Sequence, residues 1–334
     1  MRGGVFVLGV IYPLAVALLI PVSSAAYASG GANPVPATLP RQPSAVAPAA
    51  ARSLQPVTTV LAPSALDQLS SDLASIAARS GGRVGISLQE LSGPRRTSLS
   101  INAGQSFYAA SAYKAPLLMA EAQQIAAGRV GPSDVLCYDP SDAEDGWFTD
   151  YNPGSCFSRQ DLAVRAGRYS DNTAAHILVR YLGGPNALNA YAKSIGMGGS
   201  ALWIPNTTTP NDLSQAWVNE ALGRLGGAPA KGWLYPILTH TASEQGIPPG
   251  VPAGVAVVHK VGSMYGTEND SGYVTDGRIA YVLSVAVDGP DEVSGFGVIA
   301  RVSARIWQYE RSRPDYVAPI IASPAPPVWP DRHH

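Results

Sequence analysis

Charged side chains are scarce in this sequence. Asp, Glu, Lys and Arg make up 14% of the 334 residues, hydrophobic residues make up 46%, and the formal net charge is −1. A protein that binds nucleic acid needs a concentrated basic surface to neutralise the phosphates. The composition therefore argues against nucleic acid as a partner, while the length allows one large domain with a sizeable core.

Motifs of several catalytic classes are also missing. The sequence contains no G-x-S-x-G, so an α/β-hydrolase triad is not expected. It contains neither H-E-x-x-H nor a paired C-x-x-C, which are common zinc-binding motifs. Asp142, Glu144 and Asp145 lie close together but do not follow the spacing of an EF-hand. We therefore expect no metal and no organic cofactor.

The N-terminus has the pattern of a secretory signal peptide. A positive start at Arg2 precedes an uncharged apolar stretch, Val5–Val22, and Ala26 and Ala28 then form an A-x-A pattern. We predict a signal peptide over residues 1–28, cleaved after Ala28, and a secreted or extracytoplasmic protein. The alternative is an uncleaved membrane anchor, because the apolar stretch is almost long enough to span a bilayer.

Cysteine is limited to Cys137 and Cys156. Paired, they would close a loop of about 20 residues and stabilise the fold by about 3 kcal/mol. Two free thiols are the alternative. Because the N-terminus indicates export, we predict the disulfide.

Two segments are unsuited to a packed core. Residues 29–63 are rich in Pro, Ala and Ser, and residues 317–334 form a second proline-rich segment. We interpret them as a linker and a tail on either side of one folded domain, residues 64–316.

Within that domain the hydrophobic pattern predicts an α+β fold. Residues 64–79 place leucines at helical spacing behind a serine cap, and two stretches at 83–91 and 96–102 alternate as strands do. The pattern is mainly helical from 112 to about 225. Three further strands follow, and residues 294–310 form a last helix.

Strands from both ends of the domain would most simply join in one antiparallel sheet. We therefore expect an α/β lobe made of residues 64–108 and about 250–316. An all-helical lobe, residues 109–249, would be inserted between them.

Three short motifs follow one another along the chain. Ser111 and Lys114 form S-x-x-K, Ser170–Asn172 reads S-D-N, and Lys260–Ser263 reads K-V-G-S at the end of a predicted strand. The motifs begin 59 and 90 residues apart. A cap serine, a solvated lysine and an ordinary turn would explain each motif separately, but not their joint order.

In this order and spacing the motifs resemble the S-x-x-K, S-D-N and K-T-G motifs of class A β-lactamases and related penicillin-recognising serine enzymes. The segments 206–215 (NTTTPNDLSQ) and 269–287 (NDSGYVTDGRIAYVLSVAV) are also similar to segments of that family. The resemblance extends from about residue 64 to residue 308. It implies a β-lactamase/transpeptidase-like fold and a small-molecule or peptidoglycan-peptide substrate.

Lysine usage supports the same conclusion independently. Of 23 basic residues only four are lysines, and two of these, Lys114 and Lys260, fall on motif positions. A buried lysine can lose its proton, whereas arginine cannot. Chemistry that needs a neutral amine would keep lysine at these positions.

Four residues are the expected catalytic group. Ser111 would be the nucleophile. Lys114, one helical turn away, would be its base once burial and Lys260 have lowered its pKa. Ser170 would lie between Lys260 and the reacting centre and pass a proton to the leaving nitrogen.

Asn172, Gly262 and Ser263 are the expected substrate-binding residues. Asn172 would hydrogen-bond the substrate amide, and the backbone N–H groups of Ser111 and Ser263 would form an oxyanion hole. The strand that ends at Ser263 would pair with an extended, peptide-like substrate.

Two positions depart from the family pattern. Class A β-lactamases carry a glutamate in the loop before the threonine-proline segment, as the base for deacylation. Here no Asp or Glu occurs between Asp171 and Asp212, and Asp212 itself is interpreted as a helix cap. Val261 stands where the family has threonine, so a hydroxyl that could bind a substrate carboxylate is lost. We therefore expect acylation of Ser111 but slow deacylation.

Two further features have structural alternatives. The loop between the cysteines contains Trp147, Phe148 and Tyr151, one of which would supply the aromatic residue that the family has at the mouth of its cleft; a solvated loop is the alternative. His259 precedes Lys260 on a strand and would point to the opposite face, which favours a packing role.

Together these features predict an exported active-site serine hydrolase. It would transfer an acyl group from a β-lactam or a D-Ala-D-Ala-like amide to Ser111. Two other functions stay open: an acyl transferase or cyclase with an amine acceptor, and a non-catalytic protein that binds penicillin or peptidoglycan. The linker is compatible with association with the cell wall or the outer face of the membrane.

Overall fold

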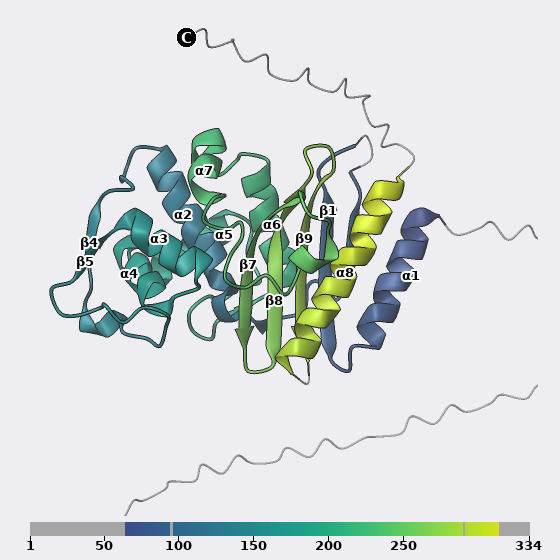
Figure 1. Cartoon of the computed structure of the whole chain (residues 1–334), viewed down its shortest axis with the longest axis horizontal. Helices are drawn as coiled ribbons and strands as arrows, with labels where there is room; N and C mark the ends of the chain where they lie inside the picture. Colours follow the sequence, from purple (N-terminus) through teal and green to yellow (C-terminus); the bar gives the residue numbers. More distant parts are fainter. Residues whose placement is uncertain (1–63, 94–95, 290, 314–334) are drawn as a thin grey trace, which may run out of the picture. The chain divides into compact units, whose positions relative to one another are not determined.

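The computed structural model describes residues 64–93, 96–289 and 291–313 (Figure 1). The predicted signal peptide, linker and tail lie outside the described residues and stay predictions. Within the described residues, no helix is both long and apolar enough to cross a membrane.

A five-stranded antiparallel sheet forms the centre of the domain, with the strand order β2-β1-β9-β8-β7 (Figure 1). Its strands are β1 (Arg83–Glu90), β2 (Ser98–Ile101), β7 (Ala256–Met264), β8 (Thr267–Thr275) and β9 (Ala280–Asp288). β1, from the first part of the domain, pairs with β9, from its last part. The predicted α+β fold, with strands from both ends in one sheet, is confirmed.

Two helices, α1 (Ala65–Ala78) and α8 (Glu292–Ser312), cover one face of the sheet (Figure 1). Ser64 begins α1 as predicted. Its hydroxyl accepts a hydrogen bond from the N–H of Asp67, and the Asp67 carboxylate accepts one from the N–H of Ser64. The leucines of α1 are buried against α8 and the sheet.

The other face is covered by α6 (Pro210–Ala221), which packs close to the sheet because the facing residues are small. A Cβ added at Gly85 would lie 2.8 Å from the Pro210 ring. The indole N–H of Trp217 donates to Ser271 Oγ at 3.1 Å. This contact joins α6 to the middle of the sheet.

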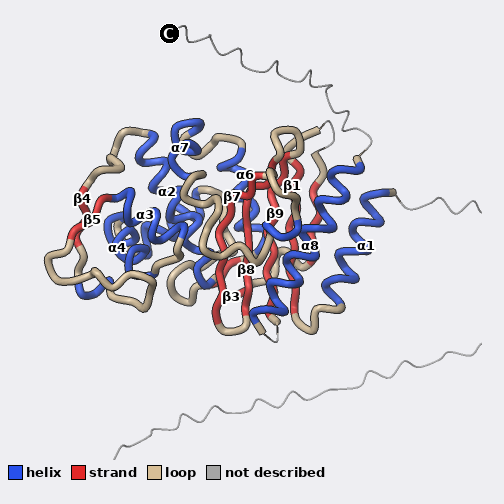
Figure 2. The backbone as a smooth tube through the Cα atoms, viewed as in Figure 1, coloured by secondary structure: helices blue, strands red, loops and turns tan. Residues whose placement is uncertain are grey.

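The remaining helices form a separate lobe beside the edge strand β7 (Figure 2). They are α2 (Lys114–Ala126), α3 (Arg159–Arg168), α4 (Asn172–Leu182), α5 (Pro185–Ser194) and α7 (Gly227–Leu234). Two short strand pairs interrupt this mainly helical region: β3 (Phe107–Tyr108) with β6 (Thr207–Thr208), and β4 (Val135–Cys137) with β5 (Cys156–Ser158). Such strands are too short to produce an alternating pattern in the sequence, which explains why they were not predicted.

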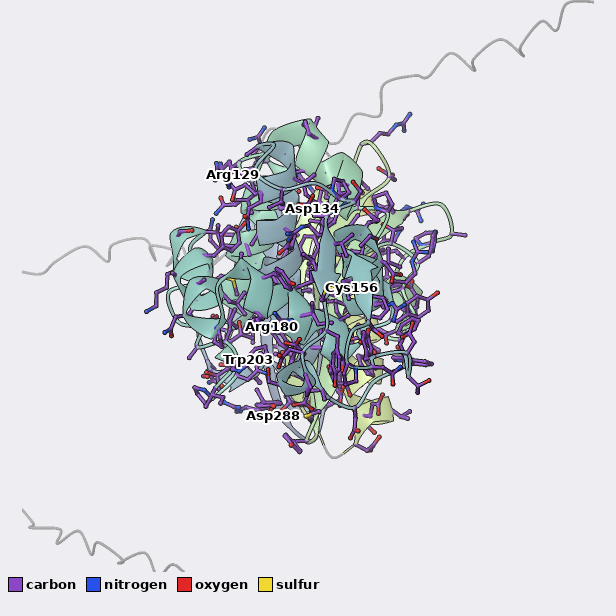
Figure 3. All side chains as sticks on the ribbon, turned by 90° about the vertical axis from the view of Figure 1, so that its left-hand side faces the viewer. Arg129, Asp134, Cys156, Arg180, Trp203 and Asp288 are labelled. Atoms are coloured by element: carbon purple, nitrogen blue, oxygen red, sulfur yellow. A yellow bond between two sulfur atoms is a disulfide. The ribbon has the colours of Figure 1, made fainter. Side chains whose placement is uncertain are left out.

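The predicted disulfide is present. Cys137 and Cys156 lie opposite each other in the β4–β5 pair and are joined (Cys156 is labelled in Figure 3). The bond closes the base of the loop between the two strands, and this loop reaches the cleft described below.

A buried ion pair holds the helical lobe together. Glu121 on α2 is fully buried and accepts a hydrogen bond from Arg159, which is 5% exposed at the start of α3. Burial raises the pKa of Glu121, and the charge of Arg159 opposes that rise. A buried charge of either sign is costly without its partner.

We expect Arg159→Ala to lower the free energy of unfolding by about 3–5 kcal/mol, because it leaves the Glu121 carboxylate buried and unpaired. Urea unfolding followed by circular dichroism measures the change. Arg129→Ala, which removes an exposed arginine from the same lobe, is the control and should cost less than about 0.5 kcal/mol. Equal losses in the two variants would contradict the assignment.

Candidate active site

Ser111 lies in the tight turn that leads into α2. Ala110–Tyr113 form a short 3-10 helix, and Ala110 has a φ of 46°, in the left-handed region that L residues rarely adopt. The turn lines a cleft of about 550 Å³ whose walls come from the helical lobe and the end of β7. Among the residues predicted from the sequence, those that line this cleft are Ser111, Ser170, Asn172, Lys260 and Ser263.

The Lys114 side chain is fully buried beneath Ser111. Its Nζ lies 3.1 Å from Ser111 Oγ, 2.6 Å from Asn172 Oδ1 and 2.5 Å from the carbonyl oxygen of Ser170. Burial lowers the pKa of Lys114 well below its usual value, and the charge of Lys260 lowers it further. A neutral amine has two N–H groups and one lone pair. With the N–H groups on the amide and carbonyl oxygens, the lone pair is left for the Ser111 hydroxyl.

The Ser170 hydroxyl lies between the two lysines. Its Oγ is 3.0 Å from Lys260 Nζ and 3.3 Å from Lys114 Nζ. Lys260 also donates to the carbonyl oxygen of Val261 at 2.8 Å. Burial lowers the pKa of Lys260 to about 8, while Asp270 opposes the shift. At neutral pH the arrangement can therefore hold one charged and one neutral amine at the same hydroxyl.

Asp171 anchors the wall of the cleft opposite β7. It is fully buried. Its Oδ1 accepts hydrogen bonds from the Ala174 N–H and the Tyr151 hydroxyl, and its Oδ2 accepts from the backbone N–H of Trp147. The same carboxylate therefore caps α4 and holds the loop between the cysteines. This second role joins distant segments and was not predicted from the sequence.

Gly262 brings β7 against the turn that carries Ser111. A Cβ added at Gly262 would lie 2.3 Å from the carbonyl oxygen of Ala109 and 2.7 Å from the backbone nitrogen of Ala112, so a larger residue does not fit. Because of this close approach, Ser263 and Ser111 line the same cleft. The substrate-binding role of Gly262, Ser263 and Asn172 stays a prediction.

Exposed apolar side chains surround the mouth of the cleft. Trp147 comes from the loop between the cysteines, Ile204 from the loop before α6, and Tyr265 from the β7–β8 turn; they are 70%, 84% and 84% exposed. Of the three aromatic residues suggested for the mouth, Trp147 lines the cleft, and the other two contact Arg165 instead. The rim is suited to a substrate with apolar groups.

His176 lines the cleft as well and was not predicted. It lies one helical turn after Asn172 on α4, and its ring stacks against Trp203 with the centroids 4.3 Å apart (Trp203 is labelled in Figure 3). Burial lowers the pKa of His176, and Glu144 opposes this. The spacing of four residues from Asn172 is the signal that could have indicated it.

His259 has a different environment from the one predicted. It is fully buried, as a packing role requires, but its two ring nitrogens lie 2.8 Å from Asp270 Oδ1 and 3.1 Å from Glu244 Oε1. Burial alone would lower the pKa of His259, but the two carboxylates overcome this and raise it to about 9. Lys260, its neighbour on β7, reaches Ser170 in the cleft.

The prediction that Asp212 is a helix cap is wrong. Thr209 is the N-cap of α6, and its hydroxyl accepts a hydrogen bond from the N–H of Asp212 at 3.1 Å. Asp212 lies in the first turn, where its Oδ2 accepts a hydrogen bond from Ser200 at 2.6 Å. Pro210 at the first helical position moves the start of the helix to Thr209, since proline fits there without a free N–H.

Comparisons with known proteins agree with this geometry. A sequence profile of the beta-lactamase enzyme family matches residues 68–310. The chain is 30% identical to the β-lactamase CTX-M-25 of Escherichia coli over 238 residues, which cover 63% of this chain and 78% of that enzyme.

Two solved structures are similar. The β-lactamase of Sphaerobacter thermophilus has a TM-score of 0.66 and 26% identity, with 73% of this chain and 98% of that chain covered. The protein PBP-A has a TM-score of 0.68 and 25% identity, with 73% of this chain and 96% of that chain covered. A variant of PBP-A is an acyl-enzyme complex with penicillin G.

We expect Gly262→Ala to reduce the rate at which Ser111 is acylated by about 10²-fold, because the added methyl group must push β7 away from the Ser111 turn. Acylation is measured by intact-mass spectrometry with a β-lactam. Gly232→Ala on α7 is the matched control, since a Cβ there meets no atom within 4 Å. An acylation rate for Gly262→Ala equal to that of the control would contradict this role.

Proposed function

This chain belongs to the beta-lactamase enzyme family and is a serine hydrolase of the β-lactamase type, and from this premise we propose a more specific activity. It is an exported enzyme that opens a β-lactam or a D-Ala-D-Ala-like amide, forms an ester with Ser111 and releases the acyl group slowly. The observation that carries the proposal is the position of Lys114 Nζ, 3.1 Å from Ser111 Oγ and bonded to two oxygen acceptors.

The acylation step follows from these contacts. Lys114 accepts the hydroxyl proton as Ser111 Oγ forms a bond to the carbonyl carbon of the substrate. The backbone N–H groups of Ser111 and Ser263 stabilise the oxyanion of the tetrahedral intermediate. When the carbon–nitrogen bond breaks, the Ser170 hydroxyl gives its proton to the leaving nitrogen. The Ser170 hydroxyl then receives a new proton from the lysines on either side of it.

Slow deacylation is supported by the loop before α6. This loop reaches the cleft with Trp203, Ile204 and Asn206, none of which can act as a carboxylate base. Of the described residues that line the cleft, the one carboxylate is Glu144, which is exposed and comes from the loop between the cysteines. Water at the acyl ester would therefore be weakly activated.

Export and a cell-wall substrate belong to the same proposal. The apolar N-terminal segment and the disulfide between Cys137 and Cys156 are typical of proteins that act outside the cytoplasm. D-Ala-D-Ala-like peptides are the amides that such an enzyme would meet there. The apolar rim of the cleft supports a small-molecule or peptide substrate.

Intact-mass spectrometry of the mature protein with benzylpenicillin tests the proposal. We expect a stable adduct of the mass of one intact penicillin, absent from Ser111→Ala. Rapid loss of penicillin without an adduct would contradict slow deacylation, and the absence of both adduct and turnover would exclude benzylpenicillin itself as an acyl donor. Adding an amine separates a transferase from a hydrolase, because the product would shift from acid to amide. A protein that only binds would leave Ser111 unmodified.

Ile204→Glu is expected to accelerate deacylation by about 10², the effect typical of a positioned general base. Ile204 is 84% exposed, so its replacement removes few packing contacts. Ile204→Gln has the size of the glutamate without a base and is the matched control. The lifetime of the acyl-enzyme is measured by mass after free penicillin is removed. Equal lifetimes of the two variants would argue that deacylation is limited by something other than a missing base.

A further inference from the structure

The end of the cleft beyond Lys260 is formed by β7 and by a residue of β8 behind it. Val261 and Ser263 line the cleft from β7. In the β7–β8 register Ser263 lies opposite Glu268, so the two side chains share one face of the sheet. We call Val261, Ser263 and Glu268 the Ser263 end of the cleft.

Glu268 is held in place with an incomplete set of partners. The residue is 2% exposed, and its Oε2 has no hydrogen-bond partner among the described residues. Its stem packs against Gly295 on α8, where an added Cβ would lie 2.5 Å from Glu268 Cγ. The Glu268 carboxyl group is thus buried, fixed by its contact with α8 and only partly bonded. Ser263, which lines the cleft and lies opposite Glu268 in the sheet, indicates the role of Glu268.

A substrate carboxylate would be stabilised by a positive charge at the Ser263 end, but the ionisable group there, Glu268, is acidic. Burial raises the pKa of Glu268 to about 7, the Ser263 hydroxyl opposes the rise, and Glu292 adds to it. The carboxyl group is therefore partly ionised at neutral pH. Among the described residues that line the cleft, none is an arginine, and the one lysine is Lys260. Lys260 is already bonded to Ser170 Oγ and to the Val261 carbonyl oxygen.

The hydrogen bonding of Ser263 also disfavours a substrate anion at this end. A serine hydroxyl has one proton, and Ser263 is placed to give it to the Glu268 carboxylate. Its lone pairs are then left for the cleft, where they accept hydrogen bonds and repel an anion. Val261 has no hydroxyl to compensate. The side chains of the Ser263 end therefore offer a substrate hydrogen-bond acceptors rather than donors.

We propose that this cleft selects acyl donors whose group at the Ser263 end carries no negative charge, such as an amide or ester in place of a carboxylate. The proposal rests on the proposed acylation of Ser111 and narrows its substrate class. A D-Ala-D-Ala-like peptide with a free terminal carboxylate would be disfavoured, and one whose terminus is an amide or ester would be preferred. Burying a substrate carboxylate beside the carboxyl group of Glu268 costs free energy, whereas an amide N–H finds an acceptor in Ser263. The exposed apolar rim, with Trp147, Ile204 and Tyr265, suits the same uncharged donors.

The test compares benzylpenicillin with its methyl ester, which differ only in the charge of one group. The rate of Ser111 acylation by each is measured by intact mass for wild type, Glu268→Gln, Val261→Thr and the control Glu292→Gln. The ratio of the two rates within one variant cancels changes in the nucleophile itself. In wild type we expect the ester to react faster than the free acid, after correction for their intrinsic rates of alkaline hydrolysis.

Glu268→Gln should raise the rate for benzylpenicillin relative to the rate for the ester by about tenfold. Val261→Thr, which adds a hydroxyl donor, should raise the rate for benzylpenicillin as well. Glu292→Gln, which removes a more distant negative charge from the first turn of α8, should change the ratio less than threefold. Glu268→Gln and Val261→Thr alter different residues. If one of them fails to fold, the other still tests the inference.

Protonation of Glu268 adds an independent readout. As the pH rises through about 7 the carboxyl group ionises, so acylation by benzylpenicillin should fall relative to acylation by the ester. Asp270 on β8 and His259 on β7 share the face of the sheet that carries Glu268, and Glu292 on α8 is the further acidic group that acts on it. In Glu268→Gln the pH dependence of the ratio should disappear.

Three outcomes separate the two proposals. Faster reaction of the ester, together with a ratio that Glu268→Gln shifts, supports the inference. If the free acid reacts at least as fast as the ester and Glu268→Gln leaves the ratio unchanged, the inference is overturned while acylation of Ser111 stands. If neither donor labels Ser111, the proposed function fails and the inference fails with it.

Discussion

The burial of two lysines around one serine hydroxyl is the interaction on which the site depends. In water both amines would be charged and would repel each other. Enclosed by the helical lobe and the sheet, Lys114 loses its proton more readily, while Lys260 has a pKa of about 8. Ser170 contacts both, and two oxygen acceptors orient Lys114 toward Ser111. Arginine could not take the place of Lys114, since it does not give up its proton.

The fold supplies this arrangement by joining segments that are distant in sequence. Lys260 lies on β7, which forms one edge of the sheet (Figure 1). Gly262 allows β7 to contact the turn that carries Ser111. On the other wall the carboxylate of Asp171 caps α4 and binds the loop between the cysteines through the Trp147 N–H and the Tyr151 hydroxyl. Both devices fix the position of backbone segments on which the site residues lie.

The two ends of the cleft differ in chemistry. Around Ser111 two lysines and Ser170 lie within hydrogen-bond distance of one another, and the loop before α6 contributes Ile204 to the cleft rather than a carboxylate. At the Ser263 end the buried Glu268 lies opposite Ser263 in the sheet. The residues around the candidate nucleophile are thus distinct from those to which we assign acyl release and substrate selection.

Local patterns in the sequence were sufficient for much of the fold and for choosing the candidate site residues. Helix and strand periodicities and the Ser64 cap depend on neighbours, and the S-x-x-K, S-D-N and K-V-G-S motifs each occupy a few consecutive residues. Tertiary structure alone decided which distant residues share a wall: His176 beside Trp203, and Asp171 against the loop of Trp147. Strand register and loop packing depend on contacts between segments tens to more than a hundred residues apart. The lysine pKa values follow from burial by those same contacts, so no local pattern could specify them.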